Sequence, residues 1–120
     1  MNSLAEQYRL TSDHVEVALP RALQLVERLT AEGVHAYLHH RDSATPEVAV
    51  GAYVFNDTQR IGRWVFAWPR LHTQELYWHH ARLLLARRYF QEARPVDHVE
   101  AMARDICAGL AARRRPSAGY

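Results

Sequence analysis

The chain has 120 residues with 15 basic and 13 acidic side chains, and all 15 basic residues are arginine. This length is enough for one domain with a hydrophobic core, and the 48% share of apolar residues excludes a disordered chain. A single cysteine excludes an internal disulfide, and no apolar run reaches the roughly 18 residues of a membrane span. The N-terminal residues lack the pattern of a signal peptide, so we expect a cytoplasmic protein without membrane contact.

Arginine without lysine is typical of codon usage in GC-rich genomes such as those of actinobacteria. The alternative is selection for bidentate recognition of phosphate or carboxylate. Residues 1–59 hold four arginines and eight acids, a net charge of −4, whereas residues 60–120 hold eleven arginines and five acids, a net charge of +6. The two halves either neutralise each other within the fold or leave the basic half to an anionic partner.

The first expected element is a helix. Apolar residues recur at three- and four-residue spacing within Ser12–Glu32, and Gly33 supplies a stop. Pro20 suits a first helical turn, so the helix is expected over residues 20–32. Residues 13–19 fit either a helix or a short strand.

Three strands are expected next, since β-branched and aromatic residues alternate with other residues. Asn56 and Asp57 supply turn chemistry between the second and third strands, and Pro69 ends the third. The predicted strands are Val34–His40, Glu47–Phe55 and Ile61–Trp68.

Two helices are expected to complete the chain. Thr73 can cap the first, which extends to about Glu92. Asp97 and Glu100 have the spacing of a capping box for the second, which ends before Pro116.

The expected fold is therefore α+β, in the order α-β-β-β-α-α: a helix, a three-stranded antiparallel meander and two C-terminal helices. Helices pack against the single layer of sheet. The expected organisation is a flexible lead over residues 1–11, one domain over residues 12–115 and a frayed tail over residues 116–120.

Alternation in the strands predicts two faces that are both apolar. One face is aliphatic except for Arg63, and the other is aromatic with histidines at its edge. A hairpin that pairs Phe55 with Gly62 places Tyr53 beside Trp64. Burial of each large aromatic side chain of the third strand is worth roughly 2 kcal/mol, so something is expected to cover the second face. Helices on both sides, a protein interface, and an open ligand or base-stacking surface remain alternatives.

The leading functional hypothesis is a small non-catalytic binding, adaptor or regulatory protein that acts through an apolar-aromatic interface, with a second copy or another protein as partner. We expect a homodimer. The candidate ligand or interface residues are His35, Tyr37, His39, Tyr53, Trp64, Phe66, Trp68, Tyr77, Trp78 and His79.

Two alternatives remain open. One is nucleic-acid binding by the basic half, through Arg82, Arg87, Arg88, Arg94, Arg113, Arg114 and Arg115. The other is a small-molecule-binding protein or enzyme, with a pocket lined by His35, Tyr37, His39, Glu75 and His79. Glu75 and His79 would lie close together on a helix. No known catalytic or metal-binding motif is present, so no catalytic residue, cofactor or metal is assigned.

Overall fold

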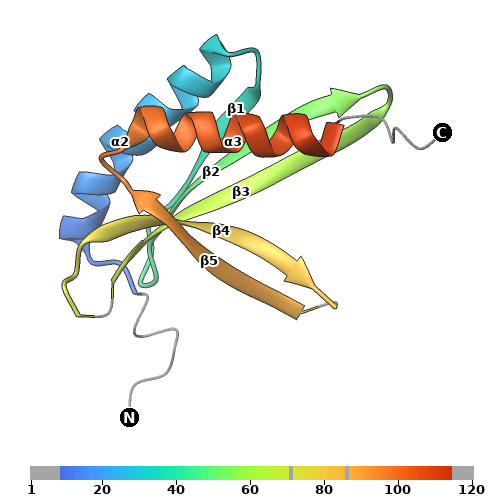
Figure 1. The fold of residues 1–120 in the computed structure, drawn as a ribbon. Coiled ribbons are helices and arrows are strands. Elements are labelled where there is room, and N and C mark those ends of the chain that lie inside the picture. Colours follow the sequence, from blue (N-terminus) through green and yellow to red (C-terminus); the bar gives the residue numbers. More distant parts are fainter. Residues whose placement is uncertain (1–8, 71, 86, 115–120) are drawn as a thin grey trace.

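The computed structural model describes residues 9–70, 72–85 and 87–114. The five strands form one antiparallel sheet in the order β1-β2-β3-β4-β5 (Figure 1). The α+β class is as predicted. The elements are α2 (Ser12–Ala31), β1 (His35–Arg41), β2 (Glu47–Asn56), β3 (Gln59–Pro69), β4 (Leu76–Leu84), β5 (Arg87–Pro95) and α3 (Val99–Arg114).

Helix α2 is continuous through Pro20. Thr11 caps it: its hydroxyl accepts the backbone N–H of His14, whose Nδ1 accepts the N–H of Thr11. This reciprocal pair satisfies two donors at the helix start. The helix predicted over residues 20–32 is present. Residues 13–19, for which the sequence left helix and strand open, belong to the same helix, because the cap rather than the proline decides where it begins.

The meander of β1, β2 and β3 is present as predicted, but the predicted register of its second hairpin was wrong. Tyr53 pairs with Gly62, and Gly51 pairs with Trp64. The turn is tighter than expected, since Asn56 already pairs with Gln59. The error is a shift by two residues, so every side chain stays on its predicted face.

The helix predicted to extend to about Glu92 was wrong: this part of the chain forms the hairpin of β4 and β5. Its Leu, Ala and Arg residues favour a helix locally. Pairing with β3, however, buries the whole side chain of Trp78 opposite Ala67, and this burial outweighs the local preference. The turn includes Leu85 at φ 51°, a left-handed conformation that is uncommon for leucine.

The single C-terminal helix is α3. It begins at Val99, and Asp97 does not cap it as predicted but accepts a hydrogen bond from Arg21 of α2. Its buried side chains include Met102, Ile106 and Leu110, which face the sheet.

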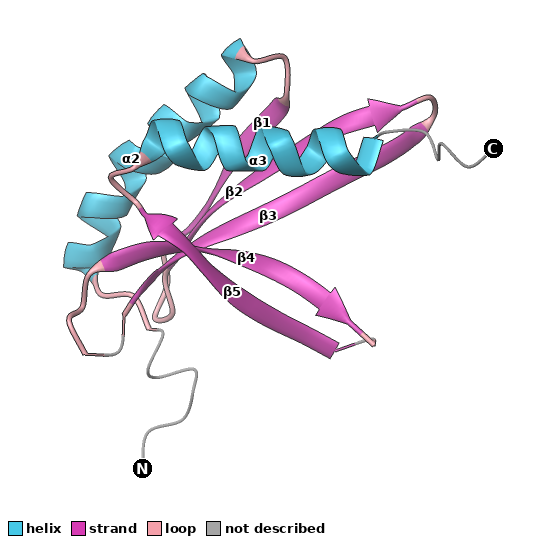
Figure 2. Cartoon of the chain, in the orientation of Figure 1, coloured by secondary structure: helices cyan, strands magenta, loops and turns pink. Residues whose placement is uncertain are grey.

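Both helices cover the same face of the sheet, the one predicted to be aliphatic (Figure 2). The described residues therefore do not form the alternative arrangement, in which helices cover both faces of the sheet. No helix in the described part of the chain is long and apolar enough to cross a membrane. The largest fully buried side chains are Leu10, Leu25, Leu29, Val48, Val50, Val65, Pro69, Trp78, Met102, Ile106 and Leu110.

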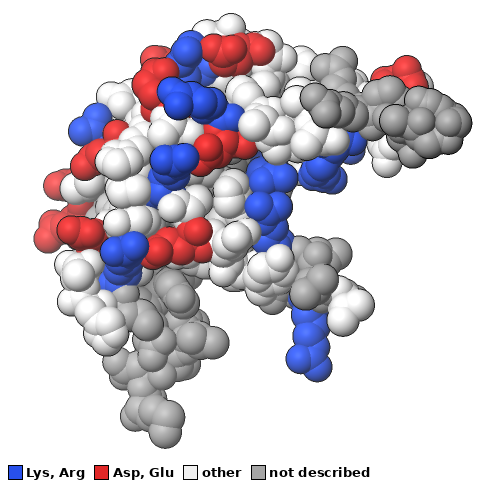
Figure 3. All heavy atoms as spheres, in the orientation of Figure 1, with Lys and Arg blue, Asp and Glu red and all other residues white. Residues whose placement is uncertain are grey.

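Two ion pairs join α2 to the start of α3. Arg21 lies 2.9 Å from Asp97, and Arg28 lies 2.8 Å from Glu100. In both pairs the arginine comes from the acidic half of the chain and the carboxylate from the basic half. Neutralisation of the two halves by each other would need the opposite arrangement. These exposed pairs are each worth about 0–1 kcal/mol, and they leave arginines of the second half unneutralised. Basic and acidic side chains are interspersed on the surface around the helices in Figure 3.

Candidate functional site

The candidate site is the face of the sheet opposite the helices, which we call the aromatic face. Alternate residues of all five strands contribute to it. Glycine makes room for the large rings: a Cβ on Gly51 would lie only 2.6 Å from Cζ of Tyr37. The rings of the aromatic face are those of His35, Tyr37, His39, Tyr53, Phe55, Trp64, Phe66, Trp68, Tyr77, His79 and Phe90.

Ring contacts connect the sheet from one edge strand to the other. Neighbouring ring centroids lie between 4.3 and 6.3 Å apart, in a chain that runs from His35 on β1 to Phe90 on β5. These separations and the mixture of stacked and edge-on pairs are typical of favourable aromatic packing. The side chains support one another laterally, so they form a preorganised surface.

The outer side of this layer remains open. Tyr37 is 38% exposed, Phe55 46% and Phe90 43%, while the tryptophans of β3 are half-buried. Large contiguous apolar surfaces on soluble proteins mark sites of interaction.

A shallow cavity of about 250 Å³ opens beside Gly62 and is lined by Tyr37, Tyr53, Arg60 and Trp64. Pockets for small molecules usually measure about 300–1,000 Å³. This cavity is smaller, and its size suits one inserted side chain better than a substrate.

Charged residues of both signs border the aromatic face. The guanidinium of Arg60 lies 3.8 Å above the ring of Tyr53. Arg41 forms an ion pair with Glu47, whose carboxylate also lies 3.9 Å from His39. An aromatic centre with a polar border is the anatomy of a protein–protein interface.

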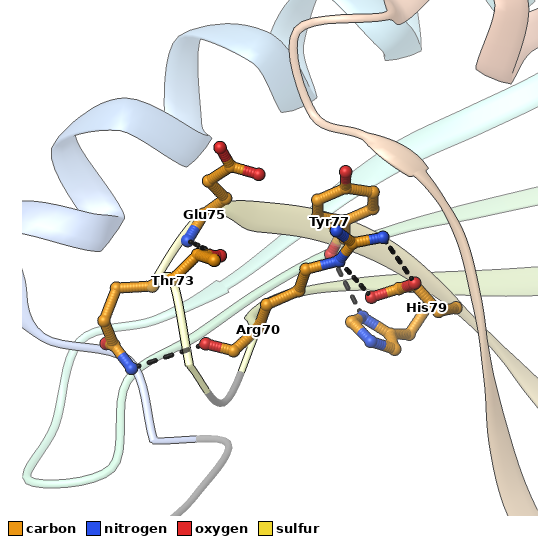
Figure 4. Close-up of polar contacts among 7 residues, drawn as sticks. Arg70, Thr73, Glu75, Tyr77 and His79 are labelled. Atoms are coloured by element: carbon orange, nitrogen blue, oxygen red, sulfur yellow. Dashed lines mark hydrogen bonds and ion pairs between the residues drawn. The ribbon is translucent and has the colours of Figure 1, made fainter.

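A second polar cluster lies where β3 turns into β4 (Figure 4). Arg70 donates to both carboxylate oxygens of Glu92, at 2.9 and 3.1 Å, and lies 3.9 Å above the ring of Tyr77. This bidentate pair lowers the pKa of Glu92. Nδ1 of His79 lies 3.1 Å from the carbonyl oxygen of Tyr77, and burial lowers the pKa of His79. Burial therefore favours the neutral form of His79.

The predicted proximity of Glu75 and His79 was wrong. Residues four apart lie close together on a helix, whereas the segment is a turn followed by a strand. Figure 4 shows Glu75 directed away from His79, with its backbone N–H donating to the hydroxyl of Thr73. The pair therefore offers no acid–base or metal chemistry.

One predicted interface residue lies elsewhere: Trp78 is fully buried beneath the helices. The predicted helix placed Trp78 near Tyr77 and His79. In the strand, alternate side chains lie on opposite faces, so Trp78 lies on the face opposite to both. Phe90 was missed for the same reason. Phe55 and Arg60 were not among the candidates, although alternation had already placed Phe55 on this face. The nine other predicted residues, His35, Tyr37, His39, Tyr53, Trp64, Phe66, Trp68, Tyr77 and His79, come together on the aromatic face.

The candidate nucleic-acid residues that the structure describes are spread over more than one surface. Arg94 is engaged by Asp105 at 2.7 Å. Arg82 and Arg113 interact electrostatically with Arg63, on the helix side of the sheet. Arg87 is exposed beside the β4–β5 turn. The side chains of Arg88, Arg114 and Arg115 lie outside the described residues.

Within the described ranges, no group of three or more His, Cys, Asp or Glu side chains could hold a metal ion. Comparison with models of known families, with curated proteins and with solved structures found no match for this chain. The functional argument therefore rests on the geometry of the surfaces.

Proposed function

We propose that this chain is a non-catalytic binding protein that self-associates through its aromatic face as a homodimer. The supporting observation is the connected aromatic layer, which crosses all five strands and which neither α2 nor α3 covers.

The size of the face agrees with this proposal. Five strands about 4.8 Å apart, with about eight residues each at 3.3 Å per residue, give roughly 600 Å² per copy. Two such faces would bury about 1,200 Å² in total, which is at the lower limit for specific, stable interfaces. Sheets packed face to face also form the cores of β-sandwiches.

The face also has the features that a two-fold interface needs. Such an interface joins identical surfaces, which must therefore be self-complementary. The aromatic face holds exposed rings, such as those of Phe55 and Phe90, and a cavity of side-chain size beside Gly62. Its border carries both arginines and carboxylates, so two copies can meet without a uniform like charge.

In light scattering after size-exclusion chromatography, we expect the wild-type protein to have twice the 13.9 kDa mass of one chain. Phe66→Glu places a charge in the centre of the aromatic face and should give a monomer, because burying an unpaired carboxylate costs several kcal/mol. Leu23→Glu is the matched control, since Leu23 is 50% exposed on α2, away from this face. It should remain a dimer.

Circular dichroism identifies any variant that fails to fold. Phe55→Arg is a second variant with less risk to folding, because Phe55 is already 46% exposed. A monomeric wild-type chain across micromolar concentrations would overturn the proposal. The proposal would also be overturned if Leu23→Glu were a monomer while folded Phe66→Glu and Phe55→Arg remained dimers.

A further inference from the structure

A second surface lies on the opposite side of the sheet, where Figure 3 shows a hollow between α3 and the β4–β5 hairpin. Arg82 of β4 and Arg113 of α3 lie close enough to Arg63 of β3 for their charges to act on it. Tyr89 of β5 pairs directly with Arg82 and is 44% exposed. We call these four residues the arginine groove.

Arg63 interrupts the aliphatic side of β3 and packs against Gly109 of α3. A Cβ on Gly109 would lie 2.9 Å from Cζ of Arg63, so the guanidinium packs directly against the backbone of α3 at this glycine. Burial lowers the pKa of Arg63, and the charges of Arg82 and Arg113 lower it further. The fold thus holds a half-buried cation beside two others of the same sign.

No carboxylate in the described residues forms an ion pair with these three arginines. Arg113 donates to the backbone carbonyl of Gly62 at 2.7 Å, and Arg82 donates to the side-chain oxygen of Gln91 at 3.2 Å. Both acceptors are neutral. The repulsion within the cluster therefore persists, and a bound anion would relieve it.

His80 adds a second observation. It lies two residues before Arg82, on the same face of β4, and its Nδ1 is buried without a hydrogen-bond partner in the described structure. Buried polar atoms in proteins normally have a partner. Burial, followed by Arg63 and Arg82, lowers the pKa of His80 to about 4. A neutral His80 therefore adds no charge to the cluster.

We propose that the arginine groove binds single-stranded nucleic acid. The guanidinium groups would hold successive phosphates, for which their planar forks are well suited. The exposed ring of Tyr89 would stack on an unpaired base. A duplex keeps its bases stacked on one another, so the tyrosine favours a single strand. The groove lies on the side of the sheet opposite the aromatic face, so this activity does not depend on dimerisation through that face.

The test is fluorescence anisotropy with a labelled oligothymidylate as salt is raised. Three phosphate contacts predict that log K falls against log salt with a slope of about −2. Arg63→Gln/Arg82→Gln/Arg113→Gln should weaken binding at least about 30-fold at low salt. The charge-matched control is Arg21→Gln/Arg28→Gln/Arg104→Gln, which removes three arginines from the outer helix surfaces. It should retain most of the affinity.

Two further variants sharpen the result. Tyr89→Ala should weaken binding about 10-fold, the loss of one base-stacking contact. Phe66→Glu should bind as the wild type does, which separates this proposal from that of the homodimer. If the triple variant does not fold, Arg82→Gln/Arg113→Gln leaves the half-buried Arg63 in place and should still weaken binding about 10-fold.

Several results would overturn the proposal. These are the absence of binding at low salt, equal losses in the groove and control variants, and loss of binding in Phe66→Glu alone. Competition by polyglutamate as effective as that by unlabelled oligothymidylate would assign the groove to acidic proteins. Tighter binding to a duplex of the same length would contradict the role of Tyr89.

Discussion

Trp78→Ala is expected to lower the free energy of unfolding by about 3–5 kcal/mol, the largest effect of any single change considered. Trp78 is fully buried between β4 and the helices, where its neighbours on the sheet include Ala67. Small neighbours on the sheet cannot fill the volume that the indole leaves. A typical domain is stable by about 5–15 kcal/mol, so the variant approaches the limit of folding. Urea denaturation followed by circular dichroism measures the loss.

Two other tryptophan variants test the reason for this loss. Trp78→Phe should cost much less, because it keeps most of the ring and removes an indole N–H that is buried without a partner in the described residues. Trp64→Ala changes a half-buried residue of the aromatic face. If that face is the dimer interface, the loss in free energy of unfolding caused by Trp64→Ala, relative to the wild-type chain, should grow with protein concentration. Equal, concentration-independent losses for Trp64→Ala and Trp78→Ala would contradict this assignment.

Acidification is expected to destabilise the fold through His80. Its pKa is about 4 in the folded chain, below the ordinary histidine value of about 6.5. The unfolded chain therefore binds a proton first. The stability that neutral His80 contributes is complete above about pH 6.5 and is lost as the pH falls towards 4. A difference of about 2.5 units corresponds to about 3 kcal/mol.

The groups that act on His80 come from three elements. Arg63 on β3 and Arg82 on β4 disfavour its protonation, Asp105 on α3 favours it, and the neighbouring His79 disfavours it. Urea denaturation between pH 7 and pH 4.5 should show a steep loss for the wild-type chain and a shallower one for His80→Gln. A residual slope remains because burial also lowers the pKa of His79.

His72→Gln is the matched control for this pH series. His72 is exposed in the turn between β3 and β4, so its replacement should leave the pH dependence unchanged. Identical slopes for the wild-type chain and His80→Gln would show that burial of this histidine does not govern acid stability.

Local pattern was sufficient for the first half of the fold. Alternation of apolar residues with a period of two identifies the strands and assigns Tyr53 and Trp64 to the same face whatever the exact register. Asn56 and Asp57 mark the turn for the same local reason. The start of α2 was less predictable, because the cap formed by Thr11 and His14 uses a histidine in an uncommon capping role.

Local pattern failed between Leu76 and Pro95. The spacing of apolar residues there fits a helix as well as two strands, and the intrinsic preferences of leucine, alanine and arginine favour the helix. The exposed edge of β3 decides the outcome, since pairing with it supplies backbone partners and buries Trp78. This tertiary effect brings Phe90 to the aromatic face and Tyr89 to the arginine groove.

Composition and periodicity already predict that the sheet has two apolar faces and that the second half of the chain carries a net positive charge. The apolar faces follow from the two-residue periodicity of the strands, and the charge distribution follows from composition. Long-range packing places α2 and α3 on the same face of the sheet, which leaves the aromatic face open. The same packing brings Arg82 and Arg113 near Arg63, from which they are distant in sequence, and none of the three forms an ion pair with a carboxylate in the described chain. Both outcomes depend on long-range packing, which no local periodicity encodes.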